Sequence, residues 1–228
     1  MSEHLKSYFA PKSWKVKKKY VKFISKPNPG PHSIGMSLPL NVIIRDILGY
    51  AKSMKEVKFI LKNKNVAVDG VRRRDSRFPV GLFDVLSFNE TNEYFRVILD
   101  TKGKIELVKI DKQESSHKIC KITGKTAVKG KVQLNLNDGK NIVTDDPQYK
   151  VGDAVLLALD GKAKIREKIS LDKGTIIYLT DGKHIGETGK VVDIIGNRIL
   201  YKTNEAVVET LKEAAFPVGK DKLLIKLG

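Results

Sequence analysis

Residues 40–74 read LNVIIRDILGYAKSMKEVKFILKNKNVAVDGVRRR and hold the clearest structural signals of the chain. Between 40 and 51 the apolar residues recur three and four positions apart, which predicts a helix with one apolar face. Ser53 is followed three residues later by Glu56, and this capping box predicts the start of a second helix. A valine-rich strand then reaches Asp69-Gly70, a pair typical of a hairpin turn. We therefore expect two short helices, a strand and a tight turn, followed at once by arginines.

Cations occupy the positions in this stretch that the apolar pattern leaves free. They fit two interpretations: a solvated basic face on a small helical hairpin packed on a sheet, or a surface that neutralises RNA phosphates. We favour the second, because arginine makes planar, bidentate contacts with phosphate and stacks on bases. Arg45 has an alternative role, which is to pair with Asp46 or Asp69 and brace the fold. The candidate RNA-binding residues here are Arg45, Lys52, Lys58, Lys62, Arg72, Arg73, Arg74 and Arg77.

Residues 1–36 form a basic segment with eight Lys and one Glu. Aromatic residues are interleaved with the lysines and the end of the segment is rich in proline, so we expect an arm without a packed core of its own. Such an arm suits RNA, because lysines pair with phosphates while rings stack on bases. The alternatives are a disordered tail, or an arm whose Trp14 docks on its own domain. The candidate RNA-binding residues of the arm are Lys12, Trp14, Lys17 and Lys18.

Charge is unevenly placed along the chain. The 228 residues carry a formal net charge of +17, of which residues 1–36 contribute +7 and residues 37–78 contribute +6. This asymmetry indicates a polyanionic partner. The single cysteine excludes a disulfide framework and no Cys/His spacing suggests zinc, so we expect no metal and no cofactor. The sequence has no apolar run like a signal peptide or a membrane span, which favours the cytoplasm and no membrane partner.

Residues 94–228 read as short strands separated by Asp-Gly and Lys-Gly turns, which predicts all-β structure. A loop at 181–190 holds three glycines that let the backbone turn tightly and approach a partner closely. Lys183, His184 and Lys190 can then reach phosphates; the alternative is a plain turn of a barrel. Residues 206–215 have the pattern of a short helix or turn. No group of side chains suggests a catalytic site.

Several of these motifs resemble a known family. Pro39-Leu40, the two helices and the Val68-Asp69-Gly70 turn resemble the S-four RNA-binding domain. APKSW at 10–14, followed by PNPGPH at 27–32, resembles the N-terminus of the archaeal and eukaryotic ribosomal protein family S-four-e, and the loop at 181–190 resembles a KOW motif. The resemblance covers essentially the whole chain, in the same order of motifs. It implies an α+β, multidomain fold with an N-terminal arm (1–36), an S-four-type RNA-binding domain (37–93), an all-β central domain (94–170) and an SH3-like KOW barrel with a C-terminal tail (171–228).

The function that the resemblance implies is that of a structural, non-enzymatic constituent of the small ribosomal subunit, from an archaeal source. It would bind ribosomal RNA and support subunit assembly and translation in the cytoplasm. The implied partners are small-subunit ribosomal RNA and neighbouring ribosomal proteins, with no small-molecule substrate. The alternative is an RNA-binding factor for rescue or assembly that is not a permanent ribosomal component. An RNA-modifying enzyme with an attached S-four module would need a large catalytic domain, which the short strands after residue 93 do not provide.

Overall fold

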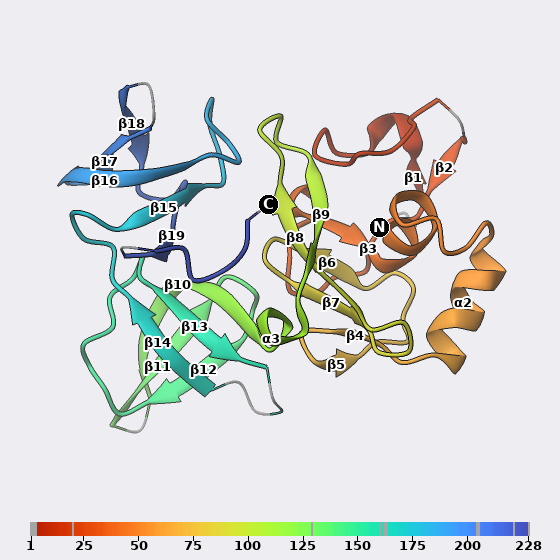
Figure 1. Cartoon of the computed structure of the whole chain (residues 1–228), viewed down its shortest axis with the longest axis horizontal. Coiled ribbons are helices and arrows are strands. Elements are labelled where there is room, and N and C mark those ends of the chain that lie inside the picture. The colour runs from red at the N-terminus through yellow and green to blue at the C-terminus, as the bar shows by residue number, and fades with distance from the viewer. Residues whose placement is uncertain are drawn as a thin grey trace. The chain divides into compact units, whose positions relative to one another are not determined.

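A computed structural model describes residues 4–19, 21–128, 130–159, 161, 164–203, 206–220 and 222–227. The chain is mostly β, with a few short helices, and it divides into two compact units (Figure 1). The first unit comprises residues 1–98 and 104–115, and the second comprises residues 99–103 and 116–228.

The first unit is built on a five-stranded sheet in the order β5-β4-β7-β8-β9, with two small two-stranded sheets, β1-β2 and β3-β6. The pairs β4–β5, β4–β7 and β7–β8 are antiparallel. The strands of this unit are β1 (Leu5–Lys6), β2 (Phe23–Ile24), β3 (Ser37–Pro39), β4 (Val66–Val68), β5 (Val71–Arg72), β6 (Pro79–Gly81), β7 (Val85–Phe88), β8 (Glu93–Leu99) and β9 (Ile105–Ile110).

The helical segments that follow β3 bury apolar side chains in the core of the first unit. Leu40, Ile43 and Ile44 are fully buried in the segment from residue 40 to residue 47. Val57 and Leu61 are fully buried in the helix that follows Ser53. Burying each of these side chains contributes roughly 1.5–3 kcal/mol to folding. The helical segments are η1 (Ser7–Phe9) and η2 (Ile34–Met36), both single 3-10 turns, α1 (Leu40–Val42), the π-helical turn η3 (Ile43–Ile47), α2 (Met54–Asn63) and α3 (Lys112–Ser115).

The first helical segment is shorter than the expected helix over 40–51. After Val42 the hydrogen bonds widen, so that the amide of Leu48 donates to the carbonyl of Ile43 at 2.9 Å. Gly49 then adopts a positive φ of 70°, which ends the helical path. The helix expected after Ser53 is confirmed as α2.

The second unit contains two five-stranded antiparallel sheets, in the orders β12-β11-β10-β13-β14 and β18-β17-β16-β15-β19. Strand β10 serves two neighbours, because residues 117–121 pair with β13 and residues 122–128 pair with β11. The strands are β10 (His117–Val128), β11 (Lys131–Leu136), β12 (Asn141–Thr144), β13 (Ala154–Ala158), β14 (Lys164–Ile169), β15 (Ile176–Leu179), β16 (Thr188–Ile195), β17 (Arg198–Lys202), β18 (Val207–Leu211) and β19 (Ala215–Gly219).

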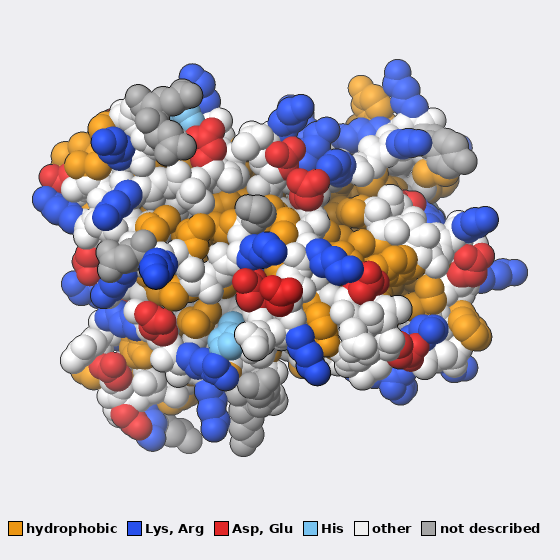
Figure 2. All heavy atoms as spheres, viewed as in Figure 1, with side chains coloured by type: hydrophobic (Ala, Val, Ile, Leu, Met, Phe, Trp, Pro, Cys, Tyr) orange, Lys and Arg blue, Asp and Glu red, His pale blue; other side chains and the backbone are white. Residues whose placement is uncertain are grey.

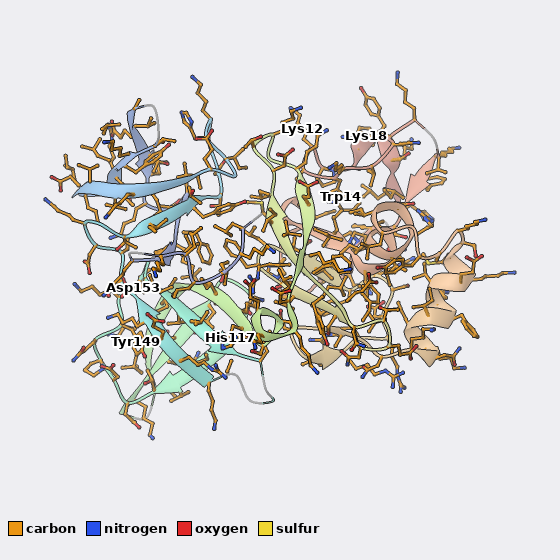
Figure 3. The ribbon with its side chains drawn as sticks, viewed as in Figure 1. Lys12, Trp14, Lys18, His117, Tyr149 and Asp153 are labelled. Atoms are coloured by element: carbon orange, nitrogen blue, oxygen red, sulfur yellow. The ribbon has the colours of Figure 1, made fainter. Side chains whose placement is uncertain are left out.

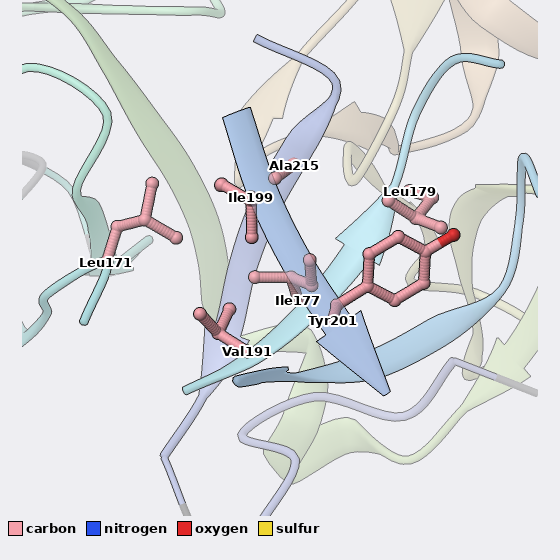
Figure 4. Close-up of a cluster of buried hydrophobic side chains, with 7 residues drawn as sticks. All are labelled: Leu171, Ile177, Leu179, Val191, Ile199, Tyr201 and Ala215. Atoms are coloured by element: carbon pink, nitrogen blue, oxygen red, sulfur yellow. The ribbon is translucent and has the colours of Figure 1, made fainter. Parts of the chain in front are cut away.

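Each sheet of the second unit has its own apolar core. The first core gathers side chains from β10, β11 and β13, including Cys120, and the second gathers side chains around β15, β16 and β17. Figure 4 shows the second core: Leu171, Ile177, Leu179, Val191, Ile199, Tyr201 and Ala215. The Nζ atom of Lys121 in β10 donates to the carbonyls of Lys212, Glu213 and Ala215 at 2.7–3.0 Å, which joins the two sheets.

Three parts of the fold differ from the expectation. The chain is mostly β, so the α+β class overstates its helices. The central domain was expected to begin at residue 94. Strands β8 and β9 instead continue the sheet of the first unit, because β8 pairs with β7. Residues 207–211 are the strand β18, where a short helix or turn was expected, because they pair with β17.

Candidate nucleic-acid interface

Helix α2 is held at its start by the expected capping box. The amide of Glu56 donates to Ser53 Oγ at 3.3 Å, and the Ser53 hydroxyl donates to Glu56 Oε1 at 2.9 Å. The amide of Lys52 donates to Glu56 Oε2 at 2.8 Å, and this bond is the main reason why the pKa of Glu56 is lowered. The helix therefore begins at a fixed residue, which sets the direction of every side chain along it.

The outward face of α2 is basic. Lys55, Lys58 and Lys62 are exposed, and within the described part of the chain no side chain forms an ion pair with any of them. Lys52, just before the helix, is exposed as well. In Figure 2 the region of α2 carries Lys and Arg side chains that project into solvent. These ammonium groups are free to meet phosphates.

The β4–β5 turn places the arginine run against the end of α2. Asp69 and Gly70 have positive φ values of 52° and 74°, as a two-residue hairpin turn requires. Arg72 follows the turn, and its Nη2 donates to the carbonyls of Lys62 and Lys64 at 3.0 and 3.3 Å. The Arg72 guanidinium thus satisfies carbonyls at the C-terminus of α2 and adds a fixed positive charge there.

The remaining arginines differ in their availability. Arg74 is exposed, whereas the guanidinium of Arg73 lies over the ring of Phe78, with 4.3 Å between Cζ and the ring centroid. Arg77 is half-buried and its carbonyl accepts from the amide of Asn28. Arg45 makes two hydrogen bonds of 2.8 Å to the carboxylate of Asp46, so of its two possible roles the structure favours the bracing one. The Asp46 hydrogen bond raises the pKa of Arg45.

The arm is part of the first unit, and Trp14 is buried within that unit (Figure 3). Its side chain is 2% exposed, and its Nε1 donates to the carbonyl of Ile34 at 3.2 Å. The structure therefore removes Trp14 from the side chains that can stack on bases. Lys12 and Lys17 are exposed, whereas Lys18 Nζ donates to the carbonyl of Ala10 at 2.7 Å. Among the described residues of the arm, Tyr8, Phe9 and Phe23 are large aromatic side chains exposed to solvent.

The glycine loop of the second unit holds Lys183 and His184, and Lys190 lies in β16 just after it. Lys183 and Lys190 are exposed, but His184 Nδ1 lies 3.0 Å from Glu187 Oε2. At Gly186 the loop backbone closely approaches another segment of this chain, where the sequence predicted an approach to a partner. A Cβ added to Gly186 would lie 2.7 Å from the backbone of Asp100. Tyr178 holds the same segment, because its hydroxyl bonds the amide and the carbonyl of Leu99 at 2.9 and 2.7 Å.

We expect Gly186→Ala to destabilise the second unit by about 1–3 kcal/mol, because φ is +82° and the added Cβ would meet Asp100. Gly182→Ala is the matched control, since Gly182 has a similar φ of +93° and open space around it. Thermal unfolding of both variants separates backbone strain from the contact. Equal losses would show that the approach to Asp100 does not matter.

Phe59 also lies on the exposed side of α2 and was not among the expected site residues. The apolar residues of this helix recur at 54, 57, 60 and 61, so a phenylalanine outside that spacing is a signal that the sequence itself carries. Among the described residues no group of three or more His, Cys, Asp or Glu side chains is placed to hold a metal ion. No helix in the described ranges is long and apolar enough to cross a membrane.

Comparisons with known proteins agree on one family. Residues 91–165 match the ribosomal family S4e, and residues 1–35 match the RS4NT (NUC023) domain. The chain is 43% identical to the small ribosomal subunit protein eS4 of Methanosphaera stadtmanae, over 99% of this chain and 95% of that protein. It is 40% identical to the eS4 protein of Methanothermobacter thermautotrophicus, over 99% and 96%. The crystal structure of the 30S ribosomal protein S4e from Thermoplasma acidophilum superposes with a TM-score of 0.72 at 33% identity, covering 82% of this chain and 97% of that one.

The mostly β, multidomain fold and these matches define a ribosomal protein. The chain belongs to the ribosomal protein eS4 family, with archaeal homologues at about 40% identity over its full length. It is a structural component of the small ribosomal subunit, and the family is not one of enzymes. The resemblance stated from the sequence is confirmed, and the alternative of a separate RNA-binding factor is set aside.

Proposed function

We propose that this chain binds ribosomal RNA of the small subunit directly, through a basic surface on the first unit. That surface is formed by the outward face of α2, by Arg72 at its end, and by the exposed Lys12 and Lys17 of the arm. The observation that carries the proposal is the set of Lys55, Lys58 and Lys62, whose ammonium groups make no ion pair among the described residues. Free surface cations lose little by exchanging counterions for phosphates.

The mechanism of this binding is positioning. The lysines of α2 and the arm neutralise phosphates and release condensed counterions, which gives affinity without sequence preference. Tyr8, Phe9 and Phe23 take the stacking role that was expected of Trp14, because these rings of the arm are exposed in the described part of the chain. Arg72 is already fixed by two backbone carbonyls, so little side-chain entropy is lost when phosphate joins it.

We propose a division of the chain into three domains, based on its secondary structure and on the resemblance of its motifs. The segment from α1 to β5 would be an S-four-type RNA-binding module, the strands β10 to β14 the central domain, and the strands β15 to β19 an SH3-like barrel of the KOW type. The capped α2 followed by the tight β4–β5 hairpin supports the first assignment. The second five-stranded antiparallel sheet, with the glycine loop before β16, supports the last.

Neighbouring ribosomal proteins are the second class of partner. The outer side of the sheet of β16, β17 and β18 exposes Val192, Ile195, Val207 and Leu211, an apolar set that suits a protein contact.

In a sucrose gradient the chain should stay with small subunits, at about one copy each, after a high-salt wash. Release by the wash would contradict the proposed network of contacts to RNA and protein.

The direct test replaces Lys55, Lys58 and Lys62 by Ala and measures affinity for purified small-subunit ribosomal RNA against salt concentration. Each lost phosphate contact lowers the slope of log affinity against log salt by about 0.7–0.9, so the triple variant should lose about 2–3 from the slope. Affinity at low salt should fall in parallel.

The matched control replaces Lys15, Lys64 and Lys109 by Ala, which removes the same charge from the same unit. These three lysines already pair with Glu106, Glu90 and Glu93 at 2.7–3.0 Å. We expect the control to change the slope much less than the α2 variant. If the two variants weaken binding equally, net charge rather than the α2 face accounts for the affinity and the proposal is wrong.

A further inference from the structure

Phe59 is a large apolar side chain in the middle of a basic surface. It is 64% exposed, whereas Val57 and Leu61 on the other side of the same helix are fully buried. An aromatic ring left in water forgoes most of the stabilisation that burial would contribute. Packing among the described residues therefore gives no reason for a phenylalanine at this position.

The cations around Phe59 follow from helix geometry. Residues three and four apart share a helix face, so Lys55 and Lys62 flank the ring along the outward side of α2. Lys58 precedes Phe59 in the chain and is exposed too. At the end of the helix, the carbonyl of Lys62 holds the Arg72 guanidinium at 3.0 Å. Lys55, Lys58 and Lys62 thus stand near one exposed ring and form no ion pair among the described residues. The one carboxylate on this side of α2, Glu56 three residues before Phe59, is held by the Lys52 amide and the Ser53 hydroxyl of the capping box.

We propose that Phe59 is a stacking platform for an unpaired base of RNA, while Lys55 and Lys62 bind the phosphates on either side of that base. This inference rests on the proposed RNA binding and names the part of the RNA that α2 meets: a single-stranded loop, bulge or end, whose bases are open to stacking. A duplex offers the ring no open base face, because its bases are already stacked on each other.

A nucleotide fits this surface better than an apolar protein surface does. A protein that buried Phe59 would also remove ammonium groups from water, at a cost that only paired acids could offset. A nucleotide supplies a flat ring face and a negative charge in the same unit, so both features of the α2 face are used together.

The test compares four variants of the full chain for affinity to purified small-subunit ribosomal RNA. Phe59→Ala should weaken binding by about 5- to 150-fold, the range expected for the loss of one base–aromatic stack. Phe59→Tyr and Phe59→Trp should bind nearly as well as the parent, because each keeps an aromatic face. Phe59→Leu should lose most of the affinity, because it keeps apolar area without the ring.

Two further readouts identify the contact. The slope of log affinity against log salt should be unchanged in Phe59→Ala, whereas Lys62→Ala should lower it by about 0.7–0.9. In Phe59→Trp, RNA should quench the new fluorescence, while the parent's single, buried Trp14 provides the background. Val143→Ala, at a site 53% exposed in the second unit, is the control for loss of an exposed apolar side chain.

The outcomes separate this inference from the proposed function. If the α2 lysines alter binding and Phe59→Ala does not, the stacking platform is wrong and the phosphate surface stands. If Phe59→Leu binds as well as the parent, the contact is apolar and the inference is also overturned. Normal RNA affinity in Phe59→Ala, together with poor incorporation into subunits, would assign the ring to a protein neighbour instead. Failure of the parent chain to bind RNA would refute the proposed function itself.

Discussion

Asp138→Asn is expected to lower the free energy of unfolding of the second unit by about 3–5 kcal/mol, the usual cost of removing one partner of a buried ion pair. The side chains of Lys118 and Asp138 are 0% and 1% exposed, and Lys118 Nζ lies 3.0 Å from Asp138 Oδ2. Lys140 Nζ approaches the same carboxylate at 3.1 Å, and the thiol of Cys120 lies 3.5 Å away. Asparagine would leave a buried ammonium facing a neutral amide.

The Asp138 carboxylate also makes the stability of the second unit depend on pH. Burial alone would raise the pKa of Asp138, but the charges of Lys118 and Lys140 outweigh it and lower the pKa to about 2. Because the folded pKa lies below the ordinary value of 3.8, the contribution of Asp138 is complete above about pH 4 and is lost as the pH falls through 2. Asp138→Asn should therefore lose less stability than the parent between pH 4 and pH 2.

The single cysteine gives a direct measurement of this prediction. Cys120 is fully buried in the same core, so its rate of labelling by a thiol reagent reports opening of the second unit. A loss of 3–5 kcal/mol corresponds to labelling faster by about 10²–10³·⁵-fold when reclosing is fast. Hydrogen exchange at the amides of β10 checks the same quantity without using the thiol.

Two control variants test the explanation. Asp145→Asn breaks an ion pair with Lys131 in which both side chains are more than half exposed, and it should leave the labelling rate unchanged. Lys118→Met combined with Asp138→Leu removes both buried charges and should recover much of the loss. A double variant no more stable than Asp138→Asn would show that the apolar packing around the pair, and not the unpaired charge, sets the cost.

Trp14→Ala is expected to destabilise the first unit by about 3–5 kcal/mol, because it empties a large buried site. The indole also donates to the carbonyl of Ile34, and the backbone next to it is tied in, since the amide of Ile105 donates to the carbonyl of Ser13 at 2.7 Å. Loss of the ring should therefore loosen the attachment of the arm as well as the core beneath it.

Trp14→Phe separates the two roles considered for this residue. It keeps most of the packing and loses one hydrogen bond, so we expect a loss of about 0.5–1.5 kcal/mol, measured by urea unfolding followed by circular dichroism. Affinity of the folded Trp14→Phe protein for ribosomal RNA should match that of the parent. Weaker RNA binding at unchanged stability would return Trp14 to the interface and contradict its assignment to the core.

Features that depend on near neighbours could be predicted from the sequence alone. The Ser53–Glu56 capping box and the Asp69-Gly70 turn are formed by residues a few positions apart, so their signals are local. The concentration of positive charge in the N-terminal third and the order of the motifs also needed no coordinates, and they led to the correct family.

Which lysines and which aromatic side chains are exposed to a partner depends on the tertiary structure. Lysines look alike in a sequence, but Lys121 is held by three carbonyls of a distant segment while Lys58 is free in solvent. Trp14 and Phe59 are both aromatic residues among lysines, and one is buried while the other is exposed because only Trp14 meets residues distant in sequence that can cover it. Residues 207–211 became a strand because β17 offers them backbone partners. These outcomes depend on contacts between residues far apart in the chain, which local spacing does not encode.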